Sequence, residues 1–320
     1  YGNYFWLDPG EAAVQNYTTK VIMDVVRRYD IDGVHLDDYF YPYPESGEFP
    51  DWVSWNRYKT GGGKLERADW RRENVNKLVR RLQSEIAKEK AWVTFGISPF
   101  GIWRPKYPEQ IRGFDAYEGL YADARLWLAK GWVDYLAPQL YWPSTAPEQS
   151  FPVLLTWWQQ QSMAGKPVWP GGAITRAHRW GAGEIVRQIE YTRQLAQPGY
   201  VHWNLSSLVA NTKLQKELLK EVYTERALVP TNPGDAGRVS KPTVTGERKT
   251  GEQHLVRWSV PSGQMVSAWL LQVKRHGKWE TKILPATTKT ELVSMKNVSA
   301  VMVSAVSRFR NVSQPAQYIP

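Results

Sequence analysis

Over its first two thirds this chain alternates between helical and strand patterns, and the alternation limits the folds that it can adopt. Apolar residues recur at helical spacing in six segments, at residues 11–29, 70–88, 123–130, 151–163, 184–196 and 211–223. Five short apolar runs predict strands, at residues 31–37, 92–99, 132–142, 167–174 and 199–205. A helix between two strands returns the chain to the same end of the sheet, so such strands pair in parallel. The pattern predicts an α/β fold.

The loops after the predicted strands distinguish between two parallel folds. None of them contains a glycine-rich phosphate-binding motif, which disfavours a nucleotide-binding doubly wound sheet. The alternative is a (β/α)8 barrel of the TIM type, which needs eight strands, whereas five are visible. We therefore expect residues 1–230 to be the C-terminal portion of such a barrel. Either about three βα units lie upstream of Tyr1, or some strands have been overlooked.

A change of pattern near residue 230 predicts a second domain. The segment "VPTNPGDAGRVSKP", residues 229–242, is rich in Pro, Gly and Asn and predicts a linker. Short alternating runs follow it, namely "HLVRWSV", "SAWLLQVKR" and "AVMVSAVSR". Their spacing, with Trp258 in an early strand, is typical of a fibronectin type III-like β-sandwich, which we place at residues 231–320.

The second domain carries most of the net charge of +10. Residues 235–320 contain 13 Lys and Arg against 5 Asp and Glu, whereas residues 1–234 contain 28 against 26. Such a basic domain favours a polyanionic partner, which could be an acidic polysaccharide, an anionic lipid or a nucleic acid. The alternative is a basic surface without a dedicated partner.

Composition excludes several other classes of site and segment. The chain contains no cysteine, so it has no disulfides, thiolate zinc sites or cysteine nucleophiles. No apolar run reaches the roughly 18 residues of a membrane span. The motifs imply neither a metal nor a cofactor, and we expect none.

Two adjacent carboxylates end the first predicted strand, "DGVHLDDY", at the rim where barrel enzymes hold their catalytic groups. Strand alternation places His35, Asp37 and Tyr39 on one face and Asp38 on the other. Because a charge on an apolar strand is costly unless it is paired or solvated, the pair suggests a function. The alternative is that the carboxylates cap the following loop or bind a structural cation.

Aromatic and hydrogen-bonding residues recur after the other predicted strands. Fourteen of the seventeen Trp lie before residue 235. A sugar ring has a flat apolar face edged by hydroxyls, so aromatic platforms beside amides and arginines predict a saccharide cleft; core packing is the alternative for each ring. The predicted substrate-binding residues are His35, Tyr39, Tyr41, Arg72, Asn74, Trp103, Arg104, Gln139, Tyr141, Trp142, Arg176, Trp203 and Asn204.

Glycoside hydrolysis requires two carboxyl groups. Asp37 is our candidate for the nucleophile or base. Its partner could be Asp38, Glu118, Asp123 or Asp134, or could lie upstream of Tyr1. Asp134 lies early in its strand and is expected at the opposite, structural rim, whereas Asp123 opens a helix and could simply cap it. We carry Asp37, Asp38 and Asp123 forward as catalytic candidates.

The motifs "WLDPG", "YDIDGVHLDDYFYPYP", "WRRENVN", "FGISPFGIWR" and "GWVDYLAPQLYW" resemble those of the bacterial glycosyl-hydrolase-like family ten, over residues 1 to about 225. Within that family they are most similar to division-associated lipoprotein glycosidases of enteric bacteria. The resemblance implies a TIM barrel that cleaves peptidoglycan glycan strands stripped of their stem peptides. The family's DDY motif falls on Asp37, Asp38 and Tyr39, and its PQ-x-Y motif falls on Pro138, Gln139 and Tyr141.

The resemblance also implies a cellular context. It places the protein on the periplasmic side of the outer membrane, held by a lipid anchor that is absent from this chain, with cell-division proteins as candidate partners. The basic second domain suits a stripped strand, because each N-acetylmuramic acid carries a free lactyl carboxylate. The family barrel begins before "WLDPG", which implies that this chain lacks about three N-terminal units.

Three other interpretations compete with this one. A chitinase signature can be laid over residues 32–39, where Asp32, Gly33 and Asp37 match, but His35 replaces an Asp and Tyr39 occupies the position of the proton-donating Glu. A non-catalytic glycan-binding module would use the same aromatic residues without turnover. Nucleic-acid binding by the basic domain lacks any base-reading motif, so we expect no nucleic-acid partner.

Overall fold

The computed structural model describes residues 1–45, 47–196, 198–230 and 239–319. It divides into two compact units, Tyr1–Tyr223 and Thr224–Pro320. The predicted domain boundary beside residue 231 and the centre of the predicted linker, residues 231–238, lie outside the described residues. In the part of the chain that is described, no helix is both long and apolar enough to cross a membrane.

The first unit contains the five predicted strands, arranged in chain order. They are β1 (Gly33–Leu36), β2 (Thr94–Ile97), β3 (Tyr135–Leu136), β4 (Gly171–Gly172) and β5 (Val201–His202). β1, β2 and β3 pair in parallel, as do β4 and β5. Single parallel bridges, Leu136 to Val168 and Gln139 to Gly171, join the two groups. The α/β prediction is confirmed, and the parallel order suits part of a (β/α) barrel.

The later strands are shorter than predicted. The predicted strand at residues 132–142 forms regular pairing only at Tyr135–Leu136, and the one at 167–174 only at Gly171–Gly172. Pro138, Pro167 and Pro170 interrupt these runs, and proline has no N–H to donate to a ladder. Outside β3 and β4, the pairing of these two runs is therefore limited to single bridges.

All six predicted helices form, and further short ones appear. The helices are α1 (Ala12–Arg28), α2 (Trp52–Thr60), α3 (Arg67–Glu89), α4 (Ala116–Gly119), α5 (Ala124–Ala129), α6 (Phe151–Gln160), η1 (Ile174–Arg176), α7 (Ala177–Trp180), α8 (Ala182–Arg193), α9 (Leu205–Ala210) and α10 (Thr212–Glu221). The segment between β1 and α3, where no helix was predicted, contains α2. α3 begins earlier than predicted because its N-cap is Glu66, while Asp69 lies inside its first turn.

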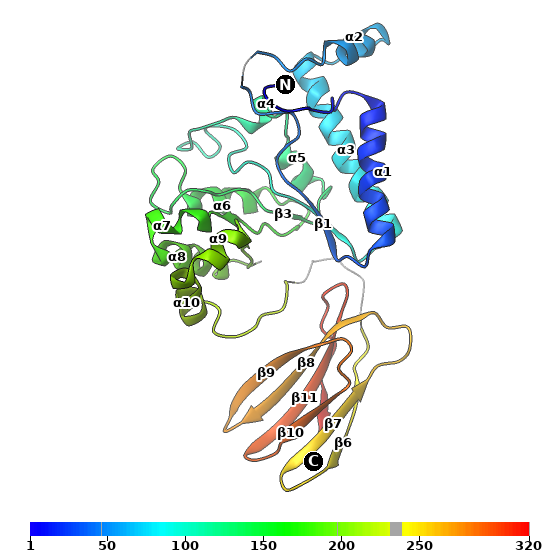
Figure 1. Ribbon diagram of the computed structural model, residues 1–320, viewed down its shortest axis with the longest axis vertical. Helices are drawn as coiled ribbons and strands as arrows, with labels where there is room; N and C mark the ends of the chain where they lie inside the picture. The colour runs from blue at the N-terminus through cyan, green and yellow to red at the C-terminus, as the bar shows by residue number, and fades with distance from the viewer. Residues whose placement is uncertain (46, 197, 231–238, 320) are drawn as a thin grey trace. The chain divides into compact units, whose positions relative to one another are not determined.

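Two long helices cover the first strands. α1 and α3 lie side by side next to β1 (Figure 1). Their apolar faces bury Met23 and Val26 of α1 and Leu82 of α3 in the same core as Phe95 and Ile97 of β2. Burying one such side chain stabilises the fold by roughly 1.5–3 kcal/mol. This helical layer therefore fixes the first strands, including β1, whose carboxyl end is followed by Asp37 and Asp38.

The second unit is made of antiparallel strands. They are β6 (Thr243–Arg248), β7 (Gln253–Ser259), β8 (Val266–Arg275), β9 (Lys278–Pro285), β10 (Thr290–Ser294), β11 (Val298–Ser307) and β12 (Ala316–Tyr318). They form a three-stranded sheet ordered β10-β7-β6 and a four-stranded sheet ordered β12-β11-β8-β9. Both sheets contribute to one core, in which Trp258 of β7 packs against Trp269 of β8. The unit is thus a β-sandwich, and its fibronectin type III assignment stays a prediction.

Candidate functional site

Asp37 follows β1 directly and is held by a residue far away in the sequence. Its Oδ1 accepts a hydrogen bond from Gln139 Nε2 at 3.0 Å. The same Nε2 donates to the backbone oxygen of Ser98 at 3.0 Å, so one amide ties together the carboxyl ends of three neighbouring strands. Asp37 is half-buried and lines a cavity of about 400 Å³, together with Tyr39 and side chains of α1 and α3. Its carboxylate is therefore fixed but open to a ligand.

Asp38 has a different environment from its neighbour. Its side chain is buried, with 4% of the residue exposed, and its Oδ2 accepts a hydrogen bond from the Tyr43 hydroxyl. Burial, followed by the nearby Asp38 carboxylate, raises the pKa of Tyr43, so that hydroxyl keeps its proton and donates it. Asp38 is thus buried and bound by a protein hydroxyl, whereas Asp37 lines a cavity.

The two carboxylates influence each other's chemistry. Burial, and then the charge of Asp38, raise the pKa of Asp37 above its ordinary value of 3.8. Hydrogen bonds from the backbone N–H of Asp38 and from Gln139 oppose this shift without cancelling it. A carboxyl group with a raised pKa that lines a cavity is a candidate for proton transfer.

Below the carboxylates, a glycine allows two rings to meet across the sheet. His35 of β1, Gly96 of β2 and Tyr135 of β3 are aligned in register. The Tyr135 ring lies across Gly96, stacks on His35 at 5.7 Å between centroids and forms a 2.9 Å hydrogen bond between its hydroxyl and His35 Nδ1. His35 is therefore engaged by Tyr135, and these two stacked rings form the floor beneath Asp37.

We expect Gly96→Ala to disrupt this floor. A Cβ at position 96 would lie 2.0 Å from Tyr135 Cζ, so the Tyr135 ring would have to leave His35. Overpacking of this kind costs about 1–3 kcal/mol, and thermal unfolding should show the loss. Gly183→Ala is the matched control, because its Cβ would meet only Arg187 Nη1 at 3.6 Å, and alanine in a helix is neutral or stabilising. An unchanged unfolding midpoint for Gly96→Ala would contradict the packing described.

The aromatic residues predicted for the rim lie in two separate groups. Tyr141 and Trp203 stack with their ring centroids 6.4 Å apart, and Trp203 is 45% exposed. Burial, and then the charge of Asp37, raise the pKa of Tyr141, so its hydroxyl remains protonated near the carboxylate. Tyr39 is 66% exposed, and Trp142 is half-buried edge-on against Phe100. Tyr39, Tyr141 and Trp203 can therefore present ring faces to a ligand.

The second aromatic group lies around another cavity, of about 390 Å³. Its lining includes Trp103, Arg104, Tyr117 and Asp123, but Asp37 is not part of it. Asp123 caps α5 by accepting from the backbone N–H of Leu126 and also accepts from Trp103 Nε1 at 3.1 Å. The structure therefore does not bring Asp123 together with Asp37. Asp123 instead caps α5, which was the alternative considered for it.

The predicted residues of α3 take part in ion pairs and a buried network. Arg72 pairs with Asp69 and with Glu118, and it lies 4.1 Å from the Tyr117 ring centroid. Asn74 donates to the Tyr41 hydroxyl at 3.4 Å, and both residues are buried. Arg72, Asn74 and Tyr41 are thus engaged in holding loops against α3. Arg104 is likewise engaged, through ion pairs with Asp115 and Glu118.

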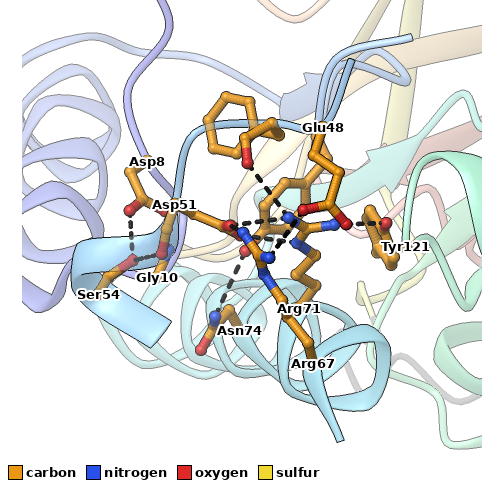
Figure 2. Close-up of polar contacts among 11 residues, drawn as sticks. Asp8, Gly10, Glu48, Asp51, Ser54, Arg67, Arg71, Asn74 and Tyr121 are labelled. Atoms are coloured by element: carbon orange, nitrogen blue, oxygen red, sulfur yellow. Dashed lines mark hydrogen bonds and ion pairs between the residues drawn. The ribbon is translucent and has the colours of Figure 1, made fainter. Parts of the chain in front are cut away.

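Figure 2 shows the network of polar contacts around Asp51 and Arg71, with Asn74 at one end. Asp51, whose side chain is 0% exposed, receives hydrogen bonds from Arg67 and from two nitrogens of Arg71. Arg71 also donates to the Tyr121 hydroxyl at 2.6 Å and to the Phe49 carbonyl at 3.3 Å. The network fixes the segment before α2 against α3.

The remaining predicted residues serve as caps or lie at the surface. The Asn204 side chain accepts from the backbone N–H of Ser207 at 3.0 Å and from the Ser206 hydroxyl, which caps α9. Arg176 ends η1 and is exposed. Asp134, expected at the structural rim, pairs with Lys166 and accepts from the backbone N–H of Phe95.

Sequence reasoning overlooked several residues that shape the site. Tyr43 was visible only as one ring in "YFYPYP", and nothing marked it as the partner of Asp38. Tyr135 could have been found only through Gly96, whose missing side chain allows the ring to cross. Glu184 of α8 is buried and accepts from the backbone N–H of Ser144 at 2.7 Å, which anchors the loop after Trp142.

The geometry limits what the site can do. Among the described residues, no group of three or more His, Asp and Glu is placed to hold a metal ion. The site instead offers Asp37 with a raised pKa, Asp38 adjacent to it, and rings that present apolar faces. Such a set suits acid–base or nucleophilic chemistry on a substrate with flat apolar faces and hydroxyl groups.

Comparisons with known proteins find similar sequences among glycosyl hydrolases. A model of the glycosyl hydrolase-like 10 family matches residues 1–168. Glycosyl hydrolase YngK of Bacillus subtilis (strain 168) is 36% identical over 312 residues, which cover 91% of this chain and 60% of that protein. Glycosyl hydrolase DigH of Escherichia coli (strain K12) is 40% identical over 161 residues, which cover 49% of this chain and 36% of that protein. The chain therefore spans less than two thirds of each of these relatives.

Among solved structures, the glycoside hydrolase domain of PgaB (BpsB) from Bordetella bronchiseptica is similar over 71% of this chain and 68% of that one. The TM-score is 0.47 and the sequence identity is 13%. This structural similarity is too weak to bear on the site.

Proposed function

The chain belongs to the glycosyl hydrolase-like 10 family, as its motifs predicted, and from this premise we propose that it acts as a glycoside hydrolase on peptidoglycan glycan strands without stem peptides. The observation that supports this most directly is the position of Asp37. Its carboxylate stands at the end of β1, oriented by Gln139 and open to a cavity. The named relatives, both glycosyl hydrolases, support the reaction class.

In the proposed reaction Asp37 either attacks the anomeric carbon as the nucleophile or takes a proton from the water molecule that attacks it. The glycosidic bond breaks, and the departing oxygen takes up a proton from water. Gln139 keeps the attacking oxygen in place. The nearby negative charge of Asp38 raises the pKa of Asp37 and so makes Asp37 a stronger base. No cofactor enters this scheme.

The proposed substrate follows from the chemistry of the rim and of the whole chain. Tyr39, Tyr141 and Trp203 can stack on the apolar faces of N-acetylated sugar rings. Stripping the stem peptides removes bulk and leaves a lactyl carboxylate on alternate sugars, which suits a chain with a net charge of +10. The proposal includes the periplasmic location, the lipid anchor and the cell-division partners implied by the motifs.

Product analysis tests the proposal. The purified full-length protein is incubated with glycan strands that lack stem peptides, with strands that carry them, and with chitin oligosaccharides, and the products are identified by mass. We expect shorter saccharides from the peptide-free strands alone. Cleavage of the chitin oligosaccharides at an equal rate would favour the chitinase-like alternative. Binding of the strands without any shorter product would instead identify a glycan-binding module.

A further inference from the structure

The four-stranded sheet of the second unit has an outer face on which side chains of three strands meet. Strand register places Lys274 of β8 opposite Trp279 of β9, and Gln272 opposite Thr281. On the other side of β8, Met302 of β11 is opposite Gln272. The alternate residues, such as Val273, point into the sandwich core, so the five residues named first form one surface. We refer to these five residues as the Trp279 face.

The Trp279 face combines an exposed ring with a cation. Trp279 is 43% exposed, and the Lys274 Nζ lies 5.8 Å from its ring centroid. Beside them, the Gln272 amide contacts the Thr281 hydroxyl at 3.5 Å, a long contact that an added ligand could replace. The neighbouring acidic residue of β9, Glu280, pairs in register with Val273, is on the opposite side of the strand and forms an ion pair with Arg275.

We propose that the Trp279 face binds an acidic polysaccharide, with a sugar ring stacked on Trp279 and a carboxylate of the same chain near Lys274. This inference rests on the proposed function for the choice of ligand, namely peptide-free glycan strands. The charge of the domain supports the choice, because residues 235–320 contain 13 Lys and Arg against 5 Asp and Glu. Gln272 and Thr281 supply the amide and hydroxyl that sugar hydroxyls bind.

The composition of the face favours a glycan over a nucleic acid. A nucleic-acid backbone carries a charge at every phosphate, and proteins that bind it present several Lys and Arg along its path. The Trp279 face presents one ammonium group among aromatic, amide, hydroxyl and thioether groups. A single cation beside a single ring suits a polysaccharide that carries a carboxylate on every second sugar.

Binding is tested in the full chain with Asp37→Asn, so that cleavage does not consume the ligand. The probes are peptide-free glycan strands and chitin oligosaccharides, which share the backbone and differ by the lactyl carboxylate. We expect Trp279→Ala to weaken binding of the peptide-free strands about tenfold. Lys274→Met should weaken their binding several-fold without affecting binding of the chitin oligosaccharides. Raising the salt concentration from about 0.05 M to about 0.5 M should reduce the contribution of Lys274.

Lys249→Met is the matched control, because Lys249 is an exposed lysine of the same domain that pairs with Glu247 at the β6–β7 turn. It should leave binding unchanged. Equal losses for Lys249→Met and Lys274→Met would show nonspecific charge attraction and overturn the proposal. Unchanged affinity for Trp279→Ala would also overturn it, as would tighter, Trp279-independent binding of duplex DNA.

A footprint locates the ligand without relying on affinity. Because the chain has no cysteine, Thr281→Cys introduces a single thiol on the Trp279 face, and Thr250→Cys introduces one at the β6–β7 turn. Peptide-free strands should slow maleimide labelling of Thr281→Cys and not of Thr250→Cys. If both thiols react at unchanged rates, the face does not bind the strands. Trp279-dependent binding without cleavage by the unsubstituted chain would refute the proposed function and leave this inference standing.

Discussion

Asp37→Asn is expected to lower the turnover of peptide-free glycan strands by about 10³-fold or more while leaving their affinity within about threefold. Asparagine keeps the shape of the side chain and still accepts a hydrogen bond from Gln139, but it cannot attack a carbon or take a proton. The loss should therefore appear in kcat and not in binding. Rates are measured by release of reducing ends, and affinity is measured by equilibrium binding.

The control for this variant is Asp24→Asn, the same change on the exposed surface of α1, where Asp24 pairs with Arg28. It should leave turnover unchanged. The pH profile gives a second check: burial and the charge of Asp38 raise the pKa of Asp37, so the rising limb should lie above the ordinary value of 3.8. A variant that cleaves at the rate of the unsubstituted chain would remove Asp37 from the mechanism.

Asp51→Ala is expected to destabilise the first unit by about 3–5 kcal/mol, because it leaves Arg71 buried without its partner. For a unit of this size the midpoint of thermal unfolding should fall by about 10 °C. Glu11→Ala is the control, since it breaks an ion pair with the exposed Arg57 and should cost about 0.5 kcal/mol or less. Equal midpoints for the two variants would contradict the role assigned to the network.

The effect of Asp51→Ala should depend on pH in a defined direction. Burial alone would raise the pKa of Asp51, but hydrogen bonds from Arg71 and Arg67 outweigh burial and hold it below 3.8. A carboxyl group whose pKa is lowered by folding stabilises the folded state above its unfolded pKa, and that contribution is lost as the pH falls through the folded value. The difference between the variant and the unsubstituted chain should therefore narrow below about pH 4.

Helices with a broad apolar stripe were predictable, and short ones were not. The spacing of Met23 and Val26 in α1 and of Val79 and Leu82 in α3 locates both helices, because those side chains face one core. α2 buries only Ser54, so it has no apolar stripe to detect. The lengths of β3 and β4 were overestimated because apolar composition does not record where a proline stops the ladder.

The site was predictable where a residue's role depends on its place in a strand. Asp37 follows its strand, and Gln139 follows another, so parallel packing brings both to one rim. Asp123, Tyr41 and Asn74 were not predictable in this way, because their partners come from unrelated loops. Local spacing cannot distinguish an arginine that faces a ligand from one that, like Arg71, holds a buried carboxylate.

The double hydrogen bond from Gln139 restricts what its amide can offer to a bound molecule. Nε2 donates to both Asp37 and Ser98, which fixes the amide plane and sets which way Oε1 points. A carbonyl oxygen only accepts hydrogen bonds. Oε1 of Gln139 can therefore accept from a ligand hydroxyl but repels a ligand carboxylate. In the proposed complex, the sugar beside Asp37 would therefore place a hydroxyl, and not a carboxylate, toward Gln139.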